Sequence, residues 1–133
     1  MAKQAIFWAG IMGTLAVGLG AFGAHGLEKS LQPSQLAVYK TGVTYHFYHT
    51  FGLAAVGILH RLFPHRWWSI AAACFLIGIV LFSGSLYLLS TRTLIGLENY
   101  RWLGPITPIG GLLFAVGWLA LALTAVKSLP KSS

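Results

Sequence analysis

Three histidines and four hydroxyl-bearing side chains are the residues of this sequence that could do chemistry in apolar surroundings. His46 and His49 are three residues apart in YHFYHTFG, a spacing that puts both rings on one face of a helix. His25 stands near the end of the first apolar segment, in GLGAFGAHGL. The hydroxyl groups come from two later segments and belong to Ser83, Ser85, Tyr87 and Thr107. Imidazole and hydroxyl groups donate and accept hydrogen bonds, and imidazole also binds metals and carries protons.

Four interpretations of this group are open. The first is structural, with each side chain bonding across helices, as is common between membrane helices. The second is a binding or transport site for a lipid head group, a quinone or a small solute. The third is a metal or haem site with His25 and His49 as candidate ligands, although no cysteine or acidic residue within the membrane joins them. The fourth is proton-linked transport or catalysis.

Catalysis is disfavoured by the residues available. The chain has two carboxylates, no nucleophile–base–acid spacing and no glycine-rich phosphate loop after a strand. We therefore expect no catalytic residue and no cofactor, and we predict that the protein is not an enzyme.

The composition specifies the surroundings in which these groups must lie. Of 133 residues, 56% are hydrophobic and 8% are charged, and the mean hydropathy is +0.74. A soluble domain carries about a quarter charged residues. The net charge of +7 is scattered between apolar blocks, a pattern typical of residues that face lipid head groups rather than nucleic acid. The sequence indicates an integral membrane protein, and its single cysteine, Cys74, excludes an intramolecular disulfide.

Four apolar blocks carry the polar residues, and each is long enough for a helix that crosses a bilayer. They are 5–24, 43–62, 67–89 and 103–126. The connections are short, which favours antiparallel neighbours. The predicted fold is therefore all-α, a four-helix transmembrane bundle in up-down-up-down order that forms one integral membrane domain over residues 1–133. A cleaved signal peptide is the rival interpretation of the first block.

The distribution of basic residues favours one orientation by a small margin. Five lie on the side of the termini and four on the other: Lys3, Arg61, Arg66, Lys127 and Lys131 against Lys29, Lys40, Arg92 and Arg101. The positive-inside rule then predicts cytoplasmic termini in the cell (inner) membrane. On the side of the termini, Trp67 and Trp68 are expected as interface anchors.

Small residues predict how the helices pack, because helices associate in lipid by close approach. A helical wheel of the first block gives two ridges that would face two neighbours: Gly13, Ala16, Val17, Gly20 and Ala24, then Thr14, Gly18, Ala21 and His25. The third block has a seam at Ala71, Cys74, Gly78 and Ser85. In the fourth, Pro105 is acceptable in a first helical turn, whereas Pro108 and the Gly110–Gly111 pair are expected to disturb the turn that follows.

Four motifs in order resemble the DUF423 family of small bacterial inner-membrane proteins, which is related to the eukaryotic transmembrane protein 256 group. They are GAFGAHGL, KTGVTYHFYHTFGL, LFSGSLYLL and GPITPIGGLLFAVGW. The positions that match the family motifs are His25, His49, Gly84, Ser85, Tyr87, Thr107, Pro108 and Trp118. The resemblance implies that relatives carry glutamine at the position of His46, which makes His46 a weaker candidate for a metal ligand than His49. It implies four spans and adds no activity.

We therefore expect a structural or accessory membrane module. Binding or transport of a ligand is the alternative function, and metal binding is the weaker alternative. The expected partners are the lipid bilayer and a second copy or a larger membrane complex, because small-residue surfaces on so short a chain favour packing with other helices.

Overall fold

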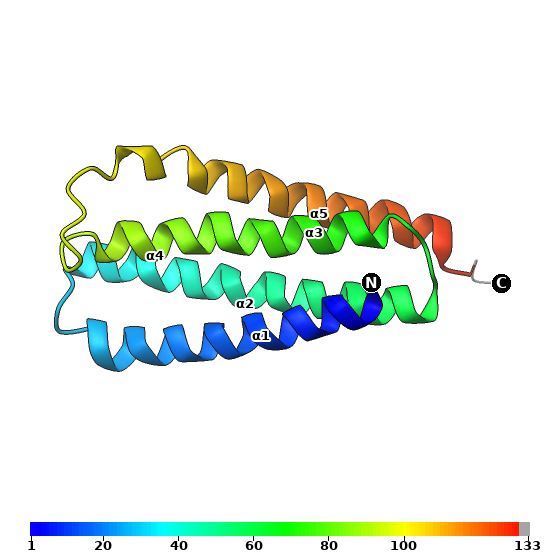
Figure 1. Cartoon of the computed structure of the whole chain (residues 1–133), viewed down its shortest axis with the longest axis horizontal. Coiled ribbons are helices and arrows are strands. Elements are labelled where there is room, and N and C mark those ends of the chain that lie inside the picture. Colours follow the sequence, from blue (N-terminus) through cyan, green and yellow to red (C-terminus); the bar gives the residue numbers. More distant parts are fainter. Residues whose placement is uncertain (131–133) are drawn as a thin grey trace.

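The computed structural model describes residues 1–130, and the regular elements in this range are all helical. They are α1 (Ala2–Phe22), η1 (Gly23–Leu27), α2 (Pro33–Leu62), α3 (Trp68–Gly78), η2 (Ile79–Ser83), α4 (Gly84–Thr91), η3 (Arg101–Leu103) and α5 (Ile106–Ser128). The π-helical turns η1 and η2 continue α1 and join α3 to α4, so that the chain forms four long rods (Figure 1). The all-α prediction is confirmed for the described residues. Lys131, counted among the basic residues on the side of the termini, lies outside them.

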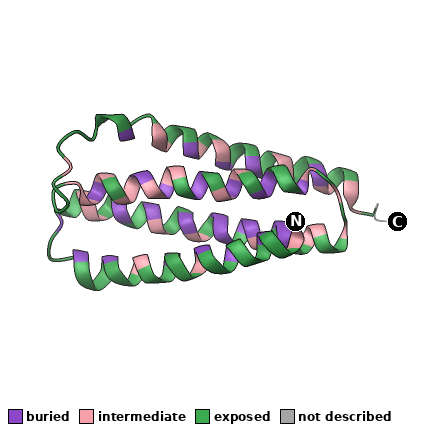
Figure 2. Ribbon diagram, in the orientation of Figure 1, coloured by how far each residue is buried: buried purple, intermediate pink, exposed green. Residues whose placement is uncertain are grey.

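The rods lie side by side in chain order, and both termini are at the same end of the molecule (Figure 1). The helix α2 packs against α1, α3, η2 and α4, and α5 packs against α3 and η2. The helix α1 packs extensively against α2 alone. Figure 2 shows the consequence, because buried positions gather along α2 and the rod of α3, η2 and α4, whereas α1 and α5 are mostly exposed.

The first helix packs through part of the first predicted ridge and through residues outside it. Its buried residues are Ala5, Ala9, Met12 and Ala16. Of the first predicted ridge, Gly13 and Gly20 do approach α2, since a Cβ atom would lie 3.6 Å from Thr50 and 3.3 Å from Val43 respectively. Ala16 of that ridge is completely buried. Its remaining members, Val17 and Ala24, are exposed, as is the whole second ridge of Thr14, Gly18, Ala21 and His25. The prediction of two packing ridges is wrong, because α1 has one extensive neighbour instead of two.

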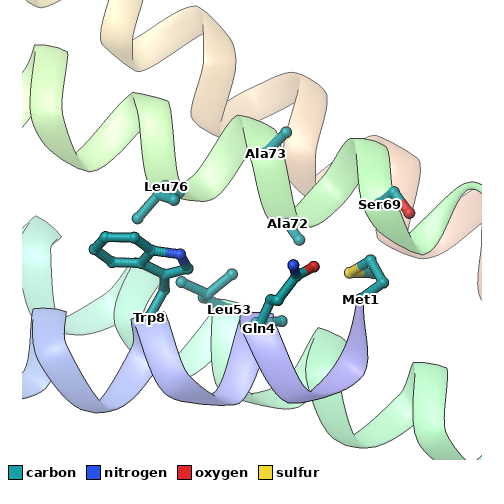
Figure 3. Close-up of a pocket in the computed structure, with 9 residues that line it drawn as sticks. Met1, Gln4, Trp8, Leu53, Ser69, Ala72, Ala73 and Leu76 are labelled. Carbon is teal, nitrogen blue, oxygen red and sulfur yellow. The ribbon is translucent and has the colours of Figure 1, made fainter.

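A groove separates the first turns of α1 from α3 (Figure 3). Trp8 and Gln4 line it from α1, Ala72 and Ala73 line it from α3, and Leu53 of α2 lies between them. Its volume is about 310 Å³. The groove leaves the first turns of α1 without close contact with α3.

The helix α2 is the central element, and its inward face follows a repeat of three and four residues. The predicted face is confirmed, since every member is buried: His46, His49, Gly52, Leu53 and Val56. By length and composition, three helical stretches among residues 1–130 can cross a membrane: Ala2–Leu27, Trp68–Thr91 and Arg101–Ser128. The helix α2 is not among them because its polar and small residues lower its hydropathy. Part of this set faces neighbouring helices, since His46, His49 and Thr50 are buried. Thr44, Tyr45 and Tyr48 are exposed.

The seam of the third block faces α5, as its spacing indicates. A Cβ atom on Gly78 would meet the Phe114 ring at 2.6 Å, and one on Gly117 would lie 3.2 Å from Cβ of Cys74. Trp68 differs from its prediction as an interface anchor, because it is completely buried and its indole donates to the Phe63 carbonyl over 2.9 Å.

The start of α5 forms regular helix, contrary to the predicted disturbance. Pro105 is the N-cap residue and Pro108 is the third residue of the helix. Both therefore stand where a backbone N–H has no acceptor within the helix, and neither proline removes a hydrogen bond. The helix continues from Ile106 to Ser128 without a break, so the predicted disturbance at Pro108 and Gly110–Gly111 is wrong.

Candidate functional site

Polar side chains of α2 and the η2–α4 segment meet inside the bundle. His46 is 3% exposed, and its Nδ1 lies 3.0 Å from the Tyr87 hydroxyl. Ser83 is completely buried and donates to the Gly42 carbonyl over 2.7 Å. Gly42 permits this approach, since a Cβ atom there would lie 3.0 Å from the Tyr87 ring. Two bonds therefore tie α2 to this segment.

The next pair joins α4 to α5. The Ser85 and Thr107 hydroxyls lie 2.6 Å apart, and Ser85 also donates to the Phe82 carbonyl over 2.9 Å. Ser83 and Ser85 are two residues apart, and such positions face opposite sides of a helix, about 200° from each other. One short segment thus bonds to α2 on one side and to α5 on the other.

A third contact ties α1 to α2 and was missed by the sequence analysis. Tyr39 is 2% exposed, and its hydroxyl donates to the Leu19 carbonyl over 2.7 Å. Gly23 makes room for this ring, because a Cβ atom there would collide with it. The signal was present, since Tyr39 precedes His46 by seven residues and so lies two turns earlier on the same face of α2. We call the residues that make these interhelical bonds the polar seam: Tyr39, His46, Ser83, Ser85, Tyr87 and Thr107.

The prediction that His25 joins this cluster is contradicted by its position. His25 is exposed and has no hydrogen-bond partner among residues 1–130. It lies in the π-helical turn η1, in which each residue advances less around the axis than in an α-helix, so the wheel drawn for a regular helix no longer applies. The predicted contact of His25 with His49 and Ser85 is absent from the described structure.

His49 lies about one turn further along the same inward face of α2, among aromatic rings. Its Nδ1 donates to the Tyr45 carbonyl over 2.7 Å. Its ring stacks on Phe114 of α5 with centroids 3.3 Å apart and planes inclined by 5°. Phe75 and Trp118 flank the ring at centroid distances of 5.7 and 6.0 Å. The histidine is 4% exposed, and it is held by stacking more than by polar contacts.

An aromatic groove opens beside His49 between α2 and α5, with a volume of about 500 Å³. We call this the aromatic groove and define it by the residues that line it: Tyr45, Tyr48, His49, Phe51, Phe114 and Trp118. Four of these rings are substantially exposed, namely Tyr45, Tyr48, Phe51 and Trp118, at 40–66%. The groove is therefore open to the surroundings of the protein.

Two buried polar atoms of the inward face of α2 have no partner among the described residues. They are Nε2 of His46, which lies near the Met12 backbone, and the Thr50 hydroxyl one turn further along α2. Other helical threonines bond to the carbonyl four residues earlier, as Thr124 does to Ala120 over 2.6 Å. The Thr50 hydroxyl makes no such bond, and its methyl group faces Gly13.

The three histidines do not share a ligand position. Within residues 1–130, no group of three or more His, Cys, Asp or Glu side chains could hold a metal ion. His46 is bonded to Tyr87, His49 is stacked on Phe114 and His25 is exposed. The candidate metal ligands His25 and His49 are thus placed in different environments.

Long apolar helices joined by buried polar side chains define a helical membrane protein. Residues 19–111 match the family described as "Protein of unknown function (DUF423)". The relatives include the UPF0382 membrane protein YwdK of Bacillus subtilis (strain 168), which is 46% identical over 128 residues that cover 96% of this chain and 99% of that protein. A UPF0382 membrane protein of Haemophilus influenzae is 41% identical over 118 residues, which cover 89% and 90%.

A fungal relative extends the range of organisms. The UPF0382 membrane protein C1782.12c of Schizosaccharomyces pombe is 40% identical over 114 residues, covering 85% of this chain and 93% of that protein. No solved structure matches the chain. The chain belongs to the DUF423 family, whose members are membrane proteins of unknown function.

Proposed function

We propose that the chain is a structural or accessory membrane protein whose four rods all cross the bilayer in up-down-up-down order. The observation that carries this proposal is the polar seam, in which every rod is bonded to a neighbour. The bonds run from Leu19 in α1 to Tyr39 in α2, from His46 to Tyr87 in α4, and from Ser85 to Thr107 in α5. Such bonds use up the groups that a polar transport path would leave free.

The rod α2 is the fourth span of this proposal. It has 30 residues, which make roughly 45 Å of helix at 1.5 Å per residue and exceed the thickness of the hydrocarbon core. Its buried polar residues His46, His49 and Thr50 lie inside the bundle, and lipid would contact the apolar faces of α1, α5 and the rod of α3, η2 and α4. In hydrocarbon, polar groups have to be paired within the protein, and the polar seam pairs the Tyr39 hydroxyl and Nδ1 of His46 on α2.

The proposed location is the cell (inner) membrane, with both termini in the cytoplasm and with a second copy or a larger membrane complex as partner. Five basic residues against four support this orientation. Buried hydroxyl and imidazole groups engaged with one another support a role without catalysis, cofactor or nucleic acid.

Labelling of single cysteines tests the four-span topology. The native Cys74 is replaced by alanine, and cysteine is placed at exposed positions on either side of α2 and beyond the third rod: S34C, R66C and T93C. Four spans predict that a membrane-impermeant maleimide labels Ser34→Cys and Thr93→Cys from one side and Arg66→Cys from the other. Labelling of Ser34→Cys and Arg66→Cys from the same side would contradict the proposal that α2 crosses the membrane.

Native mass in a mild detergent tests the accessory role. We expect the protein to migrate well above its 14.3 kDa chain mass, after correction for bound detergent. A single copy in native membrane extracts, with no larger species, would contradict the proposed oligomer or complex.

A further inference from the structure

We propose that the aromatic groove binds the head group of a quinol, an aromatic ring that carries two hydroxyl groups on an apolar tail. This inference goes beyond the structural role and does not depend on it. It starts from the protonation of His49. The Tyr45 carbonyl can only accept a hydrogen bond, so Nδ1 of His49 carries the proton. In a neutral imidazole, Nε2 is then a bare acceptor.

That acceptor is unsatisfied. Nε2 of His49 has no partner among the described residues, and, unlike Nε2 of His46, it is not sealed from the outside. The ring as a whole is 4% exposed and lines the aromatic groove. In a bilayer the fatty acyl chains that would otherwise fill the groove have no donor to offer, and an unpaired polar group in hydrocarbon is costly. The groove therefore favours an occupant with an O–H or N–H group.

The walls favour a flat ring as that occupant. The rings of Tyr45, Phe114 and Trp118 surround His49, and aromatic rings stabilise one another in stacked or edge-to-face contact. The Tyr45 and Tyr48 hydroxyls make no hydrogen bond among the described residues, and both side chains are exposed beside the groove. They can bond to a second oxygen on the ring. The volume of about 500 Å³ lies within the usual range for small-molecule sites.

A quinol is preferred over the oxidised quinone because Nε2 of His49 is a hydrogen-bond acceptor. Quinone carbonyls only accept hydrogen bonds, and so does a bare Nε2, whereas a quinol hydroxyl donates to it. The groove opens outward between α2 and α5, which leaves an apolar tail in contact with lipid.

The test compares three ring probes on the full-length protein in nanodiscs: 2-methyl-1,4-naphthoquinol kept under anaerobic reducing conditions, its 1,4-dimethyl ether, and the parent quinone. Binding is measured as partitioning in excess of empty nanodiscs. We expect the quinol to bind about three- to tenfold more tightly than either other probe, which corresponds to one net hydrogen bond. Equal binding of all three probes, or no excess over empty nanodiscs, would overturn the proposal.

Histidine resonances give a second and more local readout. In protein labelled with ¹⁵N-histidine, the quinol should shift Nε2 of His49 in a saturable manner, while the dimethyl ether should leave it unchanged. His46 is the internal control, because its sealed Nε2 should not respond. A response of both histidines, or of neither, contradicts binding in the groove.

Two variants complete the test. His49→Phe keeps a stacking ring on Phe114 and removes the acceptor, so the preference for quinol over dimethyl ether should disappear. Tyr48→Cys reports on a competing occupant, since efficient disulfide cross-linking between two copies in nanodiscs would show that a second chain covers the groove. That outcome would also overturn the proposal.

Discussion

His46 and His49 are one turn apart on the same helix, yet they occupy opposite kinds of site. His46 belongs to the polar seam, where its Nδ1 is bonded to a hydroxyl of the third rod. His49 bonds only to its own helix and stacks on a ring of α5 beside an open groove. The difference teaches that the neighbour across the interface, and not the residue type or its depth, decides whether a polar side chain in this bundle joins helices or stays available.

The largest effect on stability is expected for a substitution at Gly110, because the polar seam and the aromatic groove both require α5 to lie against η2. A Cβ atom at this position would collide with the backbone nitrogen of Phe82, which cannot move without shifting a helix. We expect Gly110→Ala to lower the free energy of unfolding by about 1–3 kcal/mol, the usual cost of overpacking, measured by denaturant titration in lipid–detergent micelles.

The neighbouring glycine is the matched control for Gly110. At Gly111 a Cβ atom would lie 3.7 Å from the Phe82 ring, an ordinary contact. Gly111→Ala makes the same gain in helix propensity and should be neutral or slightly stabilising. Equal stability of the two variants would show that α5 does not pack as closely on η2 as the structure has it.

The second effect is confined to the polar seam. Tyr87→Phe removes the hydroxyl bonded to His46 and leaves both imidazole nitrogens unpaired inside the bundle. We expect a loss of about 1–2 kcal/mol in unfolding free energy, since a buried polar group left without a partner costs its desolvation. Tyr48→Phe, at an exposed ring of the aromatic groove, is the control and should change stability little.

A smaller loss is expected for Ser83→Ala. The variant removes a bond of 2.7 Å to the Gly42 carbonyl, and we expect it to lower the unfolding free energy by about 1 kcal/mol. Ser69→Ala, at an exposed position of the same rod, should have no measurable effect. If the two serines behave alike, the Ser83 bond adds nothing to the seam.

The smallest effect, with the opposite sign, is expected for Thr50→Val. The substitution replaces a buried hydroxyl that has no partner among the described residues by a methyl group of similar size. Stability should be unchanged or raised by up to about 1 kcal/mol. The control is Thr124→Val, which removes a bond to the Ala120 carbonyl and should not stabilise. A clear loss at Thr50 would contradict the conclusion that its hydroxyl has no partner.

The sequence predicts those parts of this account that depend on local spacing. The apolar segments, the inward face of α2 and the seam of the third rod that faces α5 all follow from residues three and four apart. The bonds of Ser85 to Thr107 and of His46 to Tyr87 join residues that were expected at one end of the bundle, although their pairing depends on how the rods are rotated against one another.

Other parts depend on contacts between distant segments and could not be predicted in this way. His25 is exposed because α1 has one extensive neighbour and ends in a π-helical turn, and neither property has a local signature. The stacking of His49 on Phe114 joins residues 65 positions apart. Tyr39 is an exception. It lies two turns before His46, so the repeat of three and four residues along α2 could have placed it on the inward face.

The central claim is that buried side chains of different rods are bonded to one another, and a double-mutant cycle on His46 and Tyr87 tests it most directly. The unfolding free energies of His46→Leu, Tyr87→Phe and the double variant are measured in lipid–detergent micelles. We predict a coupling energy of about 0.6 kcal/mol or more, the typical value for a hydrogen bond between membrane helices. Additive losses, with a coupling energy indistinguishable from zero, would contradict the claim that this bond holds α2 to the third rod.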